Sequence, residues 1–454
     1  MMTARRMVSI INSQKGISAV IIAVCLVMLI GFIALSVDVS HLVVARNELQ
    51  NAADAGALAG AAELYTNDGQ SVNTDANQIG FDAAVANFSE QSPVEVNWTG
   101  GNVGDVQRGH WSFGLGSLPR GFTRNDATEP AALWGVTTEE LDENPNFINA
   151  VRVRTRRQNT PIASWFARIF GLESFEGFAE AVAYIGFAGN LKEATANAPI
   201  AICQESILKC DAEGKNCKYE CNEGRFINDS AGKEDEETGM WTNLEQNIVD
   251  GEDLCSSGTN ASEVKPLVQC GVIDSDIGVP HKALELNRNI IVNNGQIDSA
   301  FNIFYNCWKD YEDRYMTLRL PVIDCTDDPT TCAPLVGSVV VTVVHVTQQP
   351  NYKDLPVDKI YDPAVDPYMK GVWDRNKATD SCAPEENPDK CVWQKFVDAY
   401  GLLQAKLNPE TDDYSAAYHA KSIYFLPGCE PNIPMGITGG QNFGILAEIP
   451  VLVR

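Results

Sequence analysis

The 454-residue chain is poor in basic residues and in histidine. It carries 34 Lys and Arg against 60 Asp and Glu, for a formal net charge of -26, and it has five histidines. This acidity argues against a nucleic-acid-binding protein, because such proteins present a basic patch to the phosphates. The histidines are far apart, and the sequence holds no H-E-x-x-H, G-x-S-x-G or Walker-type motif. We therefore predict that the protein is not an enzyme and uses no catalytic residue, no cofactor and no small-molecule substrate.

Charge is also absent from a 21-residue run that extends from Ile17 to Val37. A helix of about 20 apolar residues crosses the hydrocarbon core of a bilayer, so this run predicts a membrane anchor. Arg5, Arg6 and Lys15 precede it. By the positive-inside rule the N-terminus then lies in the cytoplasm, and the bulk of the chain lies on the other side of the membrane.

A cleaved signal peptide is the alternative interpretation of the same run. Ala34-Leu35-Ser36 offers a small-x-small site at which such a peptide could be cut. The apolar region of a signal peptide is about 7–15 residues long, and the observed run is longer. Its length favours an uncleaved anchor, and the sequence leaves cleavage open.

Cysteine is absent from residues 38–202 and frequent after them. Cys25 lies in the apolar run, and the other twelve of the 13 cysteines follow residue 202, an even number that suits disulfides in an oxidising compartment. The spacing around residues 210–221 lacks a C-x2-C pair and a nearby histidine, so we predict no zinc or other metal site there. The sequence does not determine the connectivity, and the short loops make Cys325–Cys332 and Cys382–Cys391 plausible local pairs and no more. The disulfide candidates are Cys203, Cys210, Cys217, Cys221, Cys255, Cys270, Cys307, Cys325, Cys332, Cys382, Cys391 and Cys429.

Small residues dominate one face of the helix that follows the apolar run. They recur at steps of three and four, which predicts a packing face, and Gly56 and Gly60 form a small-xxx-small pair that permits close backbone approach. No helix breaker separates Val37 from Leu64, so anchor and packing helix form one predicted rod. The face packs either on a partner helix or on the protein's own domain, and both can hold. Its residues are Leu42, Ala45, Leu49, Ala52, Gly56, Ala59 and Gly60.

Further elements follow from hydrophobic periodicity. Residues 74–88 have helical spacing, and alternation predicts a strand over Asn149–Gln158. We expect a short amphipathic helix to begin at Pro161 and a strand or buried segment to follow it, so that a small α+β unit ends near Gly189. Beyond it, the β-branched stretch LVGSVVVTVVHVTQQ predicts a central strand, in which His345 is a hydrogen-bonded sheet residue.

The N-terminal part of the sequence resembles TadG-like proteins of the tight-adherence (Flp) pilus assembly system. The similarity lies in QKGISAVIIAVCLVMLIGFIALSVDVSHLVVARNELQNAADAGALAGA, in the GHWSFG element, and in NAVRVRTRRQNTPIASWFARIFGLESFEGFAEAVAY. Together these stretches cover residues 14–188. The resemblance implies a single-pass protein of the bacterial inner membrane that faces the periplasm and associates with the TadE- and TadF-like pseudopilins of the pilus machine.

These inferences give an α+β protein in four segments. We expect a cytoplasmic N-terminus over residues 1–16 and a transmembrane helix over 17–37. A TadG-like, pseudopilin-like region would cover 38–189, in which the anchor continues as a long pilin-like helix. A disulfide-rich periplasmic α+β domain would cover 190–454.

One position departs from the pattern of processed pilins. Prepilin-type segments carry a glutamate five residues after the cleavage glycine, and here Ile21 stands five residues after Gly16. The departure argues against prepilin processing and against incorporation as a major pilus subunit.

Other hypotheses for the function of residues 190–454 stay open. The domain could serve as an adhesin at a pilus tip or the cell surface, or, as a third hypothesis, as a tethered periplasmic hydrolase. The acidic residues Asp358, Asp362 and Asp366 offer oxygen ligands of the kind that calcium prefers. Solvated loops are the competing interpretation of this cluster, because clustered carboxylates are expected in so acidic a chain.

Overall fold

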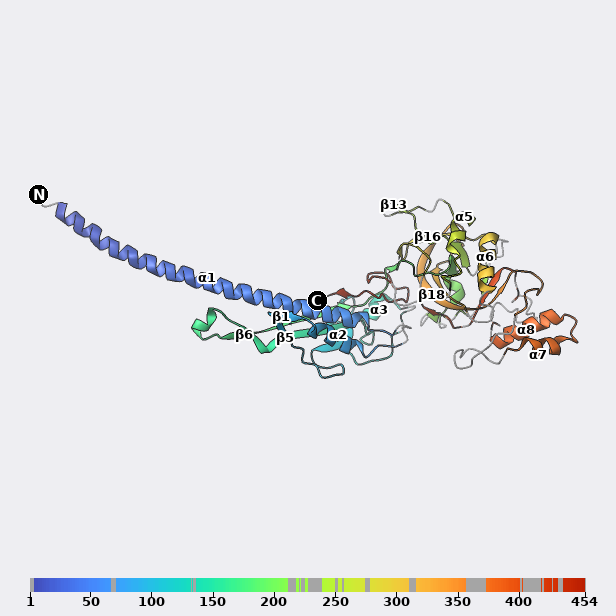
Figure 1. The fold of residues 1–454 in the computed structure, drawn as a ribbon, viewed down its shortest axis with the longest axis horizontal. Coiled ribbons are helices and arrows are strands. Elements are labelled where there is room, and N and C mark those ends of the chain that lie inside the picture. Colours follow the sequence, from blue (N-terminus) through green and yellow to red (C-terminus); the bar gives the residue numbers. More distant parts are fainter. Residues whose placement is uncertain are drawn as a thin grey trace.

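The computed structural model describes residues 4–454 except 67–70, 132, 134–135, 211–217, 220, 222–224, 228–238, 250–251, 255–256, 274–277, 310–315, 357–372, 401, 403–417, 419, 427, 432–435 and 454. Of residues 4–17, 209, 218, 225–227 and 430–431 it describes the backbone only. The molecule is elongated: one long helix leads into a first unit of sheet and helices, and a second unit follows at the far end (Figure 1).

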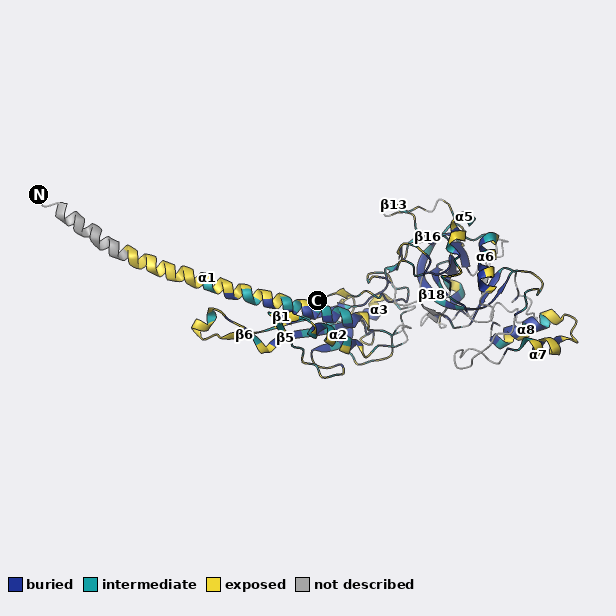
Figure 2. Cartoon of the chain, viewed as in Figure 1, coloured by how far each residue is buried: buried dark blue, intermediate teal, exposed yellow. Residues whose placement is uncertain are grey.

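The long helix α1 spans Ala4–Ala62 without interruption. Its 59 residues correspond to about 88 Å at 1.5 Å per residue. Among the residues whose burial is described, the helix is mostly exposed over residues 18–37 and buried on one side over its second half (Figure 2). The prediction of one rod that joins anchor and packing helix is thereby confirmed.

An antiparallel sheet of five strands lies under the second half of α1. The strand order is β21-β6-β5-β3-β4. Buried alanines of α1 and α2 pack on valines of β5, with Val151 and Val153 fully buried and the intervening arginines partly exposed, as the alternation predicted. The bounds of the first unit are α2 Ala76–Val85, β1 Phe88–Ser89, β2 Ser92–Pro93, β3 Val106–Ser112, β4 Gly121–Arg124, α3 Thr138–Asp142, β5 Ala150–Ala163, 3-10 helix η1 Ala167–Phe170, β6 Ser174–Tyr184 and β21 Val451–Leu452.

The prediction of a helix that begins at Pro161 is wrong. Strand β5 continues through Pro161 to Ala163, where Ile162 and Ala163 pair with Phe175 and Ser174 of β6. The helical part of this stretch is the single 3-10 turn η1 at the tip of the β5–β6 hairpin. Proline is compatible with the strand because φ near -65° suits extended structure as well as a first helical turn.

The second unit is built on strands whose pairings close into a ring. The order is β18-β16-β12-β8-β17 and back to β18, with β8 and β17 parallel and the other pairs antiparallel. Strand β18 lies at the centre, as predicted, because it also pairs with β19 and β20. The bounds are β8 Ile200–Cys203, β11 Arg225–Ile227, β12 Gly239–Thr242, β16 Asn289–Asn293, β17 Met316–Ile323, β18 Cys332–Thr347, β19 Ser422–Phe425 and β20 Glu430–Pro431.

Helices and short strand pairs surround this ring. Helix α6 contributes Phe301, Phe304 and Trp308 to the main core, while α7 and α8 enclose a separate aromatic core around Trp393. The bounds are β7 Asn190–Leu191, α4 Gln204–Ile207, β9 Leu208–Lys209, β10 Lys218–Tyr219, β13 Ile248–Val249, β14 Glu252–Asp253, α5 Ala261–Val264, 3-10 helix η2 Lys265–Leu267, β15 Leu284–Glu285, α6 Asp298–Lys309, α7 Arg375–Cys382 and α8 Pro388–Tyr400.

The end of the chain returns to the first unit. Strand β21 pairs with β6, and Leu446 forms a bridge with Phe187. The Asn442 side chain donates hydrogen bonds of 2.8 Å to two backbone carbonyls of the first unit, at Leu133 and Val136. The protein is thus α+β, with a long apolar N-terminal helix and a distal part held by disulfides, as expected. The division at residue 189 stays a prediction, and the returning strand adds a second connection across it.

Candidate membrane anchor and helix-packing surface

The apolar part of α1 has no contact that would cover it within the described residues. One described helix is long and apolar enough to cross a membrane; it includes residues 18–62, and none of its most apolar 18-residue window is buried. Val37, the predicted end of the anchor, is exposed, and Ile17 lies in the same helix. Figure 2 colours most of the described residues of this stretch as exposed.

Gly56 and Gly60 of α1 lie where the helix packs closely against α2. A Cβ atom at Gly56 would lie 2.7 Å from the Gly80 carbonyl oxygen and 2.9 Å from the Ala84 Cβ. A Cβ atom at Gly60 would lie 2.9 Å from a methyl group of Val151. No side chain larger than hydrogen fits at these positions without a shift of the neighbouring atoms. The small residues of α1 therefore allow close packing within the protein itself, against α2 and β5.

The predicted packing face lies almost wholly against the protein's own sheet and α2. Ala45, Leu49 and Ala52 are fully buried, as are the two glycines, while Leu42 and Ala59 are partly exposed. Two buried hydroxyl groups also bind the carbonyl groups of the helix: Ser89 donates to Ala45 and Thr155 to Leu49. Over residues 45–61 this face therefore packs on the protein's own domain, which is one of the two interpretations given above.

Asp38 follows the apolar run directly and binds the tip of the β5–β6 hairpin. Its side chain is 3 % exposed and accepts hydrogen bonds from the backbone N–H groups of Trp165, Phe166 and Ala167, at 2.6–3.2 Å. Desolvation alone would raise the pKa of this carboxyl, but the three N–H donors hold it below its ordinary value. The charged form of Asp38 thus joins the end of the apolar run to a segment that is 127 residues away in sequence.

Disulfides connect distant parts of the second unit. The pairs are Cys203–Cys325, Cys221–Cys429, Cys270–Cys307 and Cys382–Cys391. The local pair Cys382–Cys391 is confirmed and Cys325–Cys332 is wrong, because β8 and β17 are parallel neighbours that bring Cys203 beside Cys325. Cys210 and Cys332 are also disulfide-bonded, whereas Cys217 and Cys255 lie outside the described residues. Cys25 is free and exposed.

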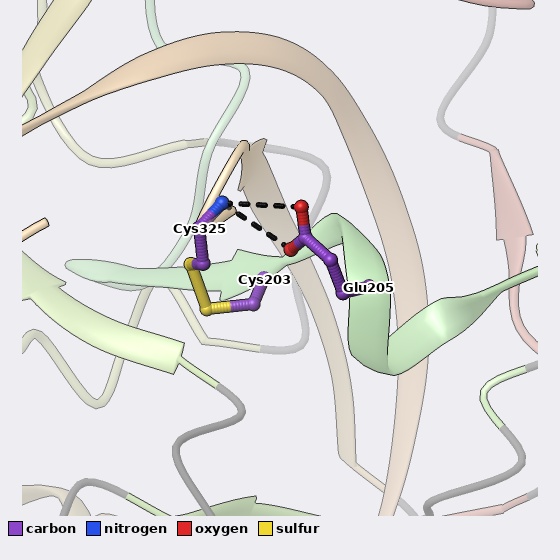
Figure 3. A group of neighbouring side chains, drawn as sticks. All are labelled: Cys203, Glu205 and Cys325. Carbon is purple, nitrogen blue, oxygen red and sulfur yellow. Dashed lines mark hydrogen bonds between the residues drawn. A yellow bond between two sulfur atoms is a disulfide. The ribbon is translucent and has the colours of Figure 1, made fainter. Parts of the chain in front are cut away.

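One cluster of two cysteines and a glutamate has the residue types of a metal site but lacks free thiolates. Glu205 lies beside Cys203 and Cys325 (Figure 3). The two sulfur atoms are bonded to each other, so neither is the thiolate that a metal ion needs. The Glu205 carboxylate instead accepts hydrogen bonds from the Cys325 N–H and the Thr326 hydroxyl, at 3.0–3.3 Å. Burial raises the pKa of Glu205, and the neighbouring Asp324 carboxyl adds to that rise. This carboxylate fixes the loop that carries the disulfide.

His345 has the environment of a structural residue, as predicted. It is 2 % exposed in β18, and its Nε2 lies 2.8 Å from the Asp354 carbonyl oxygen. The rings of Trp308, Trp393 and Phe396 lie within 5.2–5.6 Å of its ring. The three acidic residues weighed as calcium ligands, Asp358, Asp362 and Asp366, lie outside the described residues.

Two family models match the part of the chain that contains α1 and the five-stranded sheet. Residues 16–63 match the putative Flp pilus-assembly TadE/G-like family, and residues 59–183 match the putative Tad-like Flp pilus-assembly family. Together the two matches cover residues 16–183 and support a TadG-like protein of Flp pilus assembly. No curated protein and no solved structure matches the chain.

The matches confirm the resemblance to TadG-like proteins and coincide with structural boundaries. The first covers most of α1 from the start of the apolar run, and the second ends at Ala183, near the end of β6. The one apolar helix of this length among the described residues fits a single-pass membrane anchor in a pilus assembly protein. The ring of strands in the second unit lies beyond both matches.

Proposed function

We propose that this TadG-like protein is a structural component of Tad pilus assembly that is anchored by residues 17–37 in the inner membrane, with residues 1–16 in the cytoplasm and residues 38–454 in the periplasm. Its function would be to hold other Tad proteins, and no catalysis is assigned to it. The observation that carries the proposal is the family match over a continuous helix whose apolar half is bare.

The distribution of cysteine supports the proposed orientation. Ten cysteines of the second unit are disulfide-bonded, and the free Cys25 lies in the proposed anchor. Disulfides persist in oxidising compartments such as the periplasm, and the cytoplasm keeps thiols reduced. The segments 38–189 and 190–454 would then be two periplasmic units joined by the chain and by β21.

A short apolar surface on α1 supports association with a partner helix. Val43 and Val44 are both 52 % exposed and lie about 9–10 Å along the helix beyond Val37, outside the proposed bilayer. Apolar side chains clustered in water mark a protein contact. Because the glycine face is already occupied by α2, we place the contact with a TadE- or TadF-like pseudopilin on these valines.

A charged substitution on this surface tests the proposal. The double variant Val43→Glu, Val44→Glu should lose co-purification with the other Tad proteins and abolish pili, while remaining in the membrane after carbonate extraction. Asn51→Glu, an exposed change on the same helix, is the matched control and should retain both. Unchanged pili and co-purification in the valine variant would show that these valines are not the contact surface. Release of the unaltered protein by carbonate would show that residues 17–37 are not a membrane anchor.

A further inference from the structure

Among the described residues outside the proposed anchor, the tip of the β5–β6 hairpin is the segment that exposes the most large apolar side chains. Its residues 164–172 read SWFARIFGL. Ile169 and Phe170 are 77 % and 84 % exposed, and Trp165, Phe166 and Leu172 are 38–57 % exposed. A monomer in water rarely exposes five large apolar side chains on nine consecutive residues, so this tip is expected to be covered.

The position of the tip relative to the anchor indicates what covers it. Asp38, the first residue after the apolar run, binds the backbone at residues 165–167, and the Trp165 ring lies 5.5 Å from the His41 ring. His41 is four residues beyond Val37, or about 6 Å along the helix. The tip therefore lies beside α1 within about one helical turn of the end of the apolar run.

This level coincides with the lipid headgroups if residues 17–37 span the bilayer. The hydrocarbon core is about 30 Å thick and the whole bilayer about 40–45 Å, which leaves about 5–7 Å of headgroup region on each side. Tryptophan and other aromatic side chains concentrate in this region, because their apolar rings and polar edges suit its mixed environment.

We propose that residues 164–172 form a second membrane contact, in which the side chains of Trp165, Phe166, Ile169 and Phe170 enter the headgroup region of the leaflet that faces the periplasm. This inference rests on the proposed anchor. The occupant is the lipid surface, because the tip adjoins the segment that enters it.

The charge of the tip fits a phospholipid surface. Arg168 is its only charged residue, in a chain whose net charge is -26. Arg168 is exposed, and its Nε donates to the Trp165 carbonyl oxygen at 3.0 Å, so the guanidinium keeps other donors for lipid phosphates. The nearby carboxylate of Asp38 is occupied by three backbone N–H groups and is buried.

Two attachment points would fix the orientation of the first unit. An anchor helix alone leaves a domain free to rotate about the helix axis and to tilt. The tip of the β5–β6 hairpin, attached to the same helix by Asp38, would restrict both movements when it enters the headgroups. The exposed valines of α1 would then point in a defined direction toward a partner.

Quenching of Trp165 fluorescence by labelled lipids tests the proposal in the full-length protein. The protein is reconstituted in vesicles of phosphatidylethanolamine and phosphatidylglycerol that carry a nitroxide on the headgroup, near the top of the acyl chain, or near its end. The Trp165 signal is the difference between the unaltered protein and Trp165→Phe. We expect this difference to be quenched by the two shallow labels and to be less affected by the deep one. Trp98→Phe, which removes a ring that packs on Phe81 of α2, is the control and should give a difference that no lipid label quenches.

The outcomes distinguish a failure of the tip contact from a failure of the proposed anchor. A second variant, Phe170→Asp, should shift the Trp165 emission to longer wavelength and reduce its quenching, while carbonate extraction shows that the protein stays in the membrane. If the protein is integral but the Trp165 signal is unquenched, the tip contact is wrong and the anchor stands. The tip contact with lipid is also wrong, and the anchor stands, if crosslinking in cells joins the tip to another Tad protein and not to lipid. A protein that does not remain in the vesicles would overturn both.

Discussion

At the residue scale, Gly56 determines how closely α1 approaches α2. We predict that Gly56→Ala destabilises the first unit by about 1–3 kcal/mol, because the added Cβ would lie 2.7 Å from the Gly80 carbonyl oxygen and would force two backbones apart. The helix propensity of alanine, about 1 kcal/mol better than glycine, offsets part of this loss. Thermal unfolding of the protein in detergent measures the change.

The same helix supplies the control for this substitution. Gly31 lies in the proposed anchor and has open space around its Cα among the described residues, so Gly31→Ala should leave the first unit as stable as before. Equal melting temperatures for Gly56→Ala and Gly31→Ala would mean that α1 and α2 separate at little cost, contrary to the packing described above.

Asp142 gives a residue-scale prediction about pH. Burial would raise the pKa of its carboxyl, but N–H groups of Phe113 and Leu115 and the Ser112 hydroxyl bind the charged form and keep the pKa below its ordinary value of 3.8. A carboxyl whose pKa is lower in the folded state stabilises the fold above about pH 4, and this contribution is lost as the pH falls through the folded-state pKa.

Asp142→Asn should therefore cost about 1–3 kcal/mol at pH 7 and progressively less below pH 4, where the unaltered protein also loses the charge. Urea unfolding between pH 7 and pH 3 measures both curves. The exposed residue Asp82 is the control, and Asp82→Asn should leave the curve nearly unchanged. A constant difference between the Asp142 variant and the unaltered protein at every pH would contradict the assigned role of the charge.

At the element scale, the sequence predicts what is encoded within a single strand or helix. Alternation is sufficient for β5 because one face of the strand packs on α1, and the β-branched run is sufficient for β18 because it lies at the centre of its sheet. Ring closure depends on pairings such as Val322 with Ile202, which no local pattern encodes. For the same reason Cys325 pairs with the remote Cys203, although Cys332 is nearer in sequence.

The candidate site shows the same limit. The glycines of α1 predict that some backbone comes close, but not whether it belongs to the protein or to a partner. The contact between Asp38 and Trp165 joins residues 127 positions apart, and an isolated aspartate at the end of an apolar run gives no signal of its partner. The aromatic residues of the hairpin tip fit a helical period, and only the continuation of β5 to Ala163 shows that they lie on a turn.

The hairpin of α7 and α8 gives an element-scale prediction. Its disulfide Cys382–Cys391 closes a loop of nine residues, which stabilises it by about 3 kcal/mol in the chain-entropy account. The double variant Cys382→Ser, Cys391→Ser should lose about this amount locally, with faster amide hydrogen exchange in the two helices and unchanged exchange in the strand ring. The aromatic core around Trp393 and Phe396 should keep α8 folded. Faster exchange that spread to β17 and β8 would contradict the separation of the two cores.

At the scale of the whole molecule, the two units differ in what holds them together. Residues 38–202 contain no cysteine, so α1, α2 and the strands of the first unit that lie before residue 203 are held by packing and hydrogen bonds, without disulfides. In the second unit, Cys221–Cys429 closes a loop of 208 residues and Cys203–Cys325 one of 122. Each such loop stabilises the fold by about 5 kcal/mol in the chain-entropy account, which is a large share of the stability of any domain.

Reduction should therefore unfold one unit and spare the other. We expect dithiothreitol at neutral pH to accelerate hydrogen exchange in β8, β12 and β17 while β3, β5 and β6 keep their protection. Only β21, which is connected to the first sheet through the second unit, should lose protection along with that unit. Hydrogen exchange with mass spectrometry on the reduced and unreduced full-length protein measures all of these strands in one experiment. Equal loss of protection in both units would show that they unfold together, and then the returning C-terminal strand would couple them more strongly than the disulfides separate them.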